Sequence, residues 1–104
     1  MKDLKEALLQ ELQAIAGLEA RPAPVAGGTA LFYRGKEFAH FHYANELDLR
    51  LTKKRIQALG LSHPAGSVHH PQRSENSAWM EVRFNAPGDI ETVKRLVEIA
   101  ISEL

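Results

Sequence analysis

The sequence predicts a two-layer α+β domain in which helices cover one face of a mainly antiparallel sheet of about four strands. Three observations support this prediction. Apolar residues recur at helical spacing near both ends of the chain, apolar and polar residues alternate in the middle, and short turns separate the strand-like segments there. Strands joined by tight turns pair antiparallel, and amphipathic helices bury their apolar sides on one face of such a sheet. The expected order of elements is α-β-β-β-α-β-α.

The helices are predicted from apolar stripes and from capping residues. The first covers residues 3–16, has leucines at three- and four-residue spacing, and is followed by Gly17, which suits a helix end. A short helix over residues 53–59 follows Thr52 as its N-cap. The last helix begins after residues 85–89. Its expected buried stripe consists of Ile90, Val93, Val97, Ala100 and Leu104, widened by Leu96 and Ile101.

Strands are predicted over residues 30–33, 37–43, 47–51 and 77–84. Residues 19–28 contain two prolines and two glycines, so we expect a connecting loop there. The polar stretch over residues 62–76 is expected to be a second, longer loop. It contains three histidines, namely His63, His69 and His70.

The turn at residues 44–45 determines which side chains share a face of the sheet. A two-residue turn there pairs Tyr43 with Glu46 and places the histidines of the preceding strand on the side of the leucines. The helix-covered face is then expected to carry Phe38, His40, His42, Leu47, Leu49 and Leu51. The open face is expected to carry Ala39, Phe41, Tyr43, Glu46, Asp48, Arg50, Trp79, Glu81 and Arg83. A three-residue turn would reverse these sides.

The composition indicates an ordinary globular protein. The chain has 104 residues, of which 44% are apolar and 25% are charged, so we expect a single domain over residues 1–104. The formal net charge is zero, which predicts no general attraction to nucleic acid or to an anionic membrane. The absence of cysteine excludes disulfides, thiolate catalysis and cysteine-based zinc sites. Nothing at the N-terminus is typical of a signal peptide, and no apolar run reaches membrane-spanning length, so we expect a cytoplasmic protein.

Two histidines form the first candidate site. His40 and His42 point to the same side of a strand, about 6.6 Å apart along it. In one interpretation both are neutral core residues that donate hydrogen bonds to backbone carbonyls or carboxylates. In the other they bind a divalent metal ion or a small ligand. The loop over residues 62–76 would then supply a third group, and Glu37 would be an outer partner. No other cofactor is indicated.

Three further interpretations concern other parts of the chain. Aromatic residues on the expected open face, Phe41, Tyr43 and Trp79, predict a ligand surface or a homodimer interface, unless a loop covers them. The basic residues 53–55 open a helix, which indicates either a bound anion or a solvated basic turn. An enzyme with a histidine as general base is a third interpretation. No nucleophile motif supports it, and whether the chain is an enzyme stays open.

Several motifs occur in an order that resembles a known family. They are Gly27-Gly28, Glu37 to His42 (Glu-apolar-small-His-x-His), Asp48, His69-His70 and Ser77-Ala78-Trp79. Together they resemble the small bacterial and fungal proteins of the luciferase-domain family, over about residues 25–103. In that family the last triplet has glycine at its middle position, where this chain has Ala78. The family also has fewer residues between the histidine pair and this triplet than this chain has.

The resemblance implies a fold and a set of motif residues. A chain of this length is too short for the flavin-dependent luciferase barrel, which needs about 250 residues, so no luciferase activity is inferred. The leading hypothesis is a polar site for a small ligand or a metal ion, formed by Glu37, His40, His42, Asp48, His69, His70 and Trp79. The alternative is a homodimeric interaction domain whose histidines are structural.

Overall fold

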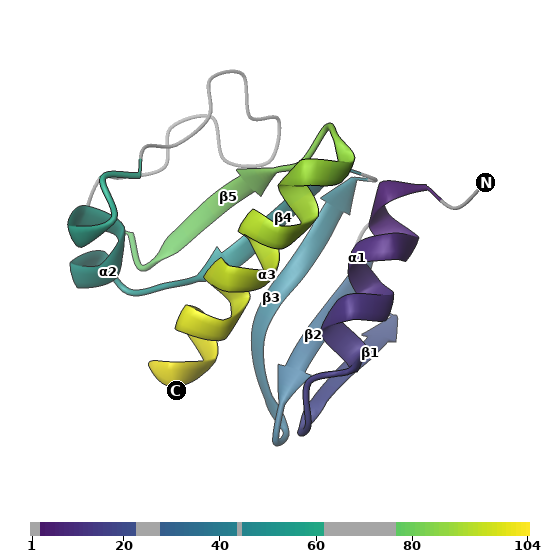
Figure 1. Ribbon diagram of the computed structural model, residues 1–104. Helices are drawn as coiled ribbons and strands as arrows, with labels where there is room; N and C mark the ends of the chain where they lie inside the picture. The colour runs from purple at the N-terminus through teal and green to yellow at the C-terminus, as the bar shows by residue number, and fades with distance from the viewer. Residues whose placement is uncertain (1–2, 23–27, 44, 62–76) are drawn as a thin grey trace.

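The computed structural model describes residues 3–22, 28–43, 45–61 and 77–104, which form one antiparallel sheet and three helices (Figure 1). The strands lie in the order β1-β2-β3-β4-β5, so each pairs with its neighbour in the sequence. The helices α1 and α3 pack side by side across one face of this sheet, and α2 lies beyond the end of β4. The α+β prediction is therefore confirmed, with one strand more than expected. The elements are α1 (Leu4–Gln13), β1 (Leu18–Pro22), β2 (Thr29–Tyr33), β3 (Lys36–Tyr43), β4 (Glu46–Arg50), α2 (Lys53–Ala58), β5 (Trp79–Arg83) and α3 (Pro87–Ser102).

The additional strand is β1, and the loop predicted over residues 19–28 was wrong for its first part. β1 pairs with β2 along its whole length, and Leu18 at its start is buried in the core. Proline has no backbone N–H to donate to a neighbouring strand. Pro22 is compatible with β1 because β1 lies at the edge of the sheet and has a neighbour on one side only. Residues 23–27 lie outside the described residues.

Side chains cap the N-terminal ends of α1 and α2, as predicted for Thr52, whereas α1 ends at Gln13, before the predicted helix end at Gly17. The Asp3 carboxylate accepts a hydrogen bond from the Glu6 N–H at 2.7 Å, and the Thr52 hydroxyl accepts one from the Arg55 N–H at 3.3 Å. After α2, the Leu61 N–H donates to the Ile56 carbonyl and Gly60 has a positive φ, which together give a left-handed helix ending. None of the described helices is long and apolar enough to cross a membrane.

The core lies between the sheet and the two long helices. Its largest fully buried side chains are Phe38, Phe84, Leu8, Leu12, Leu31, Leu47, Leu49, Leu51, Met80, Val93 and Val97. The predicted stripe of α3 is confirmed at Val93, Val97 and Ala100, but it was wrong at Leu104, which is 38% exposed. The reason is that α3 ends at Ser102, so Leu104 no longer follows the helical stripe.

A β-bulge in β3 reverses the predicted sides of the sheet around the histidines. Tyr43 pairs with Glu46 as expected, but the register then shifts between Phe41 and Tyr43, so that Phe41 pairs with Leu47 and His40 with Asp48. The extra residue of a bulge changes which face the preceding residues occupy. The prediction that His40 and His42 share the leucine face was therefore wrong.

The same bulge moves two residues into the core. Ala39 and Phe41, which were predicted on the open face, are buried with the leucines, and the Phe41 ring meets Phe84 edge to face. The bulge thus buries an aromatic ring under the helices and leaves the imidazoles on a face that carries polar partners. Because adjacent strands align their side chains in pairs, the register gathers the following residues on the face away from α1 and α3, here called the polar face: His40, Glu46, Asp48, Arg50, Trp79, Glu81 and Arg83.

Candidate metal centre

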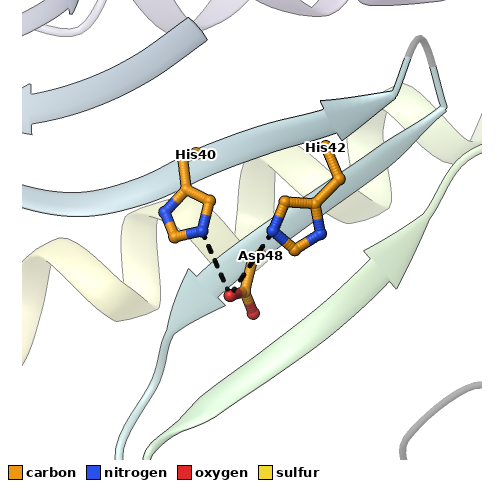
Figure 2. Close-up of side chains that lie close together, drawn as sticks. All are labelled: His40, His42 and Asp48. Carbon is orange, nitrogen blue, oxygen red and sulfur yellow. Dashed lines mark ion pairs between the residues drawn. The ribbon is translucent and has the colours of Figure 1, made fainter. Parts of the chain in front are cut away.

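The centre of the polar face is Asp48 of β4, whose side chain lies between two imidazole rings of β3. Asp48 is 1% exposed. Its Oδ2 atom lies 3.3 Å from Nε2 of His40 and 3.9 Å from Nε2 of His42 (Figure 2). The two ring centroids are 4.9 Å apart. One carboxylate oxygen and two imidazole nitrogens therefore converge on one small region.

The other nitrogen of each ring faces a second carboxylate. Nδ1 of His42 is hydrogen-bonded to Oε1 of Glu46 at 3.1 Å, and Nε of Arg83 donates to the other oxygen of Glu46, also at 3.1 Å. Nδ1 of His40 lies 3.6 Å from Oε1 of Glu37. This nitrogen is buried and finds no hydrogen-bond partner within the described part of the chain. Each histidine thus stands between Asp48 on one side and an outer glutamate on the other.

Glu46 is held in its ionised form by its neighbours. Burial alone would raise the pKa of the Glu46 carboxyl, because an ionised group loses hydration inside a protein. Hydrogen bonds with the His42, Arg83 and Glu81 side chains, together with the charge of Arg83, outweigh burial and hold this pKa below its ordinary value. Glu46 is therefore a fixed negative charge beside His42.

Trp79 borders the site on the side of His40. Its ring centroid lies 5.4 Å from that of His40, with the planes tilted by 44°. Phe41 does not join it, because that ring lies in the core, so the predicted aromatic surface was wrong at this position. The side chain of Tyr43 lies outside the described side chains.

All five described residues that were predicted for the site come together. Glu37, His40, His42, Asp48 and Trp79 lie close together on or beside the polar face, whereas His63, His69 and His70 lie outside the described residues. The histidines do not belong to the hydrophobic core, so their expected place among the leucines was wrong, whereas the hydrogen bond of His42 to a carboxylate agrees with the interpretation of structural histidines.

Sequence reasoning missed three members of the cluster, namely Glu46, Glu81 and Arg83. A signal was available, because these residues alternate with core residues on β4 and β5, as Asp48 does. Among the described residues, two groups of side chains have donor atoms close enough together to hold a metal ion: His40, His42 and Asp48, and also His42, Glu46 and Glu81. The second group is less suited to a cation, since Glu46 already pairs with Arg83.

The basic residues at the start of α2 show a simpler arrangement. Arg55 forms an ion pair with Glu103 at the end of α3. This contact fits the interpretation of a surface basic turn with a carboxylate neighbour.

Comparison with known proteins adds one finding. The family model described as "Luciferase domain" matches residues 35–100, which is more than half of the chain and includes every described residue of the cluster. Searches of the curated proteins and of the solved structures find no match.

Proposed function

The chain belongs to the luciferase-domain family, and within that family we propose that this member is a metal-binding protein whose ligands are His40, His42 and Asp48. Family membership assigns no ligand here, so the proposal depends on the donor atoms. The observation that carries it is the convergence of two Nε2 atoms on one carboxylate oxygen, Oδ2 of Asp48, at 3.3 and 3.9 Å.

These separations are close to those of ligands around one ion. Donor atoms that bind zinc at about 2.0–2.2 Å in a tetrahedral arrangement lie roughly 3.3–3.5 Å from one another. The His40–Asp48 separation already falls in this range, and the His42–Asp48 separation of 3.9 Å needs a shift of a few tenths of an ångström. The donor atoms of all three residues lie within 4.8 Å of one another.

The chemistry of the donors selects the class of ion. Two imidazoles with one carboxylate suit zinc and the other divalent first-row transition metals, whereas calcium and magnesium prefer ligand sets made of oxygen atoms. The sites of His40 and Asp48 on paired strands also favour metal binding, since a sheet holds its side chains more firmly than a loop does. We therefore propose zinc or a related transition metal as the ligand.

Isothermal titration of the protein with zinc tests this proposal. We expect one bound ion per chain. His40→Ala, His42→Ala and Asp48→Asn should each weaken binding by more than about 100-fold, beyond the usual effect of losing an outer partner. Calcium should give no comparable binding.

Glu11→Ala is the matched control. Glu11 is an exposed carboxylate that pairs with Lys94 at 3.4 Å, away from the polar face. This variant should bind zinc like the unmodified protein. If the unmodified protein binds no zinc, or if Asp48→Asn binds it as tightly as Glu11→Ala does, the metal function is wrong.

A further inference from the structure

The two histidines of the proposed metal centre are held differently at their outer nitrogens. Nδ1 of His42 makes a hydrogen bond of 3.1 Å to Glu46, which is 4% exposed. Nδ1 of His40 is 3.6 Å from Glu37, whose side chain is 46% exposed, and makes no hydrogen bond to any described residue. One ring therefore has a firm, buried partner and the other has a distant, solvated one.

The contact with Glu46 determines where the proton of His42 lies. Glu46 is paired with Arg83, and Arg83 stands directly opposite it on β5. An ionised carboxylate accepts hydrogen bonds and cannot donate one. The proton of the His42–Glu46 hydrogen bond must then be on Nδ1, which leaves Nε2 of the neutral ring without a proton.

We propose that Glu46, oriented by Arg83, is a positioning residue that holds His42 as its Nδ1–H tautomer and directs an unprotonated Nε2 at the metal ion. The tautomer itself is a property of the metal-free protein. Its consequence for affinity rests on the metal function proposed above. A ligating histidine whose other nitrogen donates to a carboxylate is fixed in orientation and is a better ligand.

His40 should behave in the opposite way. Its closest carboxylate oxygen is Oδ2 of Asp48, 3.3 Å from Nε2, so the metal-free ring is expected to carry its proton on Nε2. Binding of a metal ion at Nε2 must displace that proton. The ring then protonates at Nδ1, the nitrogen that faces Glu37. His42 and Asp48 thus form a prepared pair of ligands, and His40 completes the site when the ion arrives.

Nitrogen-15 NMR of the imidazole rings tests the inference without any substitution. In mildly alkaline buffer, where imidazoles are neutral, the ring correlations distinguish the two tautomers. We expect His42 as Nδ1–H and His40 as Nε2–H in metal-free protein. After addition of zinc, His42 should keep its tautomer and His40 should change to Nδ1–H. Metal-free His42 found as Nε2–H would overturn the inference.

Two substitutions at one position separate positioning from mere folding. Glu46→Gln keeps an oxygen acceptor beside Nδ1, whereas Glu46→Ala removes it. We expect Glu46→Ala to populate the Nε2–H tautomer of His42 and to weaken zinc binding by about 10–100-fold. Glu46→Gln should restore the Nδ1–H tautomer and most of the affinity. Glu37→Ala is the matched control at the other ring, and it should leave the tautomer of His42 unchanged.

The result separates this inference from the metal function. If the metal-free protein has His42 as Nδ1–H but binds no zinc, the proposed function fails and the positioning by Glu46 stands. If zinc binds to His40, His42 and Asp48 while Glu46→Ala leaves both the tautomer and the affinity unchanged, the function stands and the role of Glu46 is wrong.

Discussion

On the face of the sheet that α1 and α3 cover, paired strands bring apolar side chains together, whereas on the polar face they bring carboxylates against histidines and an arginine. Leu49 and Asp48 are neighbours on β4 and represent the two faces. They are 0% and 1% exposed. Two neighbouring residues of β4 are therefore equally buried, one among apolar side chains and the other among polar ones.

The difference follows from the physical chemistry of the two environments. An apolar side chain gains stability from leaving water, by about 25 cal/mol per Å² of buried surface. A buried carboxylate loses its hydration and is kept only where hydrogen bonds or opposite charges replace it. The face that the helices cover therefore stabilises the fold. The polar face keeps buried carboxylates at a cost in free energy, which suits a binding site. Substitutions on β4 can test whether the two faces divide these roles.

The largest effect on stability is expected on the leucine face. Leu49→Ala should lower the free energy of unfolding by about 2–5 kcal/mol, because it leaves a cavity between the sheet and the helices. Chemical denaturation measures this loss. The variant that remains folded should still bind one zinc ion, and loss of zinc binding in folded Leu49→Ala protein would argue against a separation of roles.

Asp48→Asn is the matched change on the adjacent residue. It keeps the size of the side chain but removes the charge that a metal ion needs, so zinc affinity should fall by at least about 100-fold, or 2.7 kcal/mol. Its effect on unfolding should be smaller than that of Leu49→Ala, because the packing of the helices is unchanged. A loss of stability as large as that of Leu49→Ala would show that the polar face is structural.

Gly28→Ala tests the segment of β3 that separates the faces. An added Cβ at residue 28 would lie 2.5 Å from the carbonyl oxygen of Phe41, at the edge of the bulge. The backbone must shift to relieve this clash, which should cost about 1–3 kcal/mol of unfolding free energy and weaken zinc binding through His42. Gly88→Ala is the control, since its added Cβ meets nothing within 4 Å. Equal stability of the two variants would contradict a close approach at the bulge.

The smallest expected effect is the loss of stability at acidic pH. Hydrogen bonds and the charge of Arg83 outweigh burial and lower the folded-state pKa of Glu46. The Glu46 carboxylate therefore contributes fully to stability above its ordinary pKa of 4.5. This contribution is lost as the pH falls through the lower, folded-state pKa. Unfolding measured along a series of acidic buffers should show this loss. The loss should be reduced in Glu46→Gln, and identical acid profiles for the two proteins would exclude Glu46 as a contributor.

The parts of the fold that depend on local patterns were predictable. Stripes of leucine and valine, the caps at Asp3 and Thr52, and the alternation in β5 all correspond to structures that a short segment specifies by itself. β1 was missed because its proline and charges are typical of a loop, and only pairing with β2 makes that stretch a strand.

The described residues of the site were predicted, but the face of the sheet on which the histidines lie was not. Glu37, His40, His42, Asp48 and Trp79 were identified from their residue types and from the family resemblance. Their common face depends on one extra residue in β3, and local sequence does not reveal a bulge of this kind. Glu46 and Arg83 were placed on the correct face by their alternation with core residues, but they were missed as site members because the histidines were expected on the opposite face.

The most direct test of the metal centre is a crystal structure of the zinc-loaded protein with an anomalous difference map at the zinc absorption edge. We expect one peak at about 2.0–2.2 Å from Nε2 of His40, Nε2 of His42 and a carboxylate oxygen of Asp48. A map with no peak on the polar face, while the two imidazoles remain in direct contact with Asp48, would contradict the proposed function.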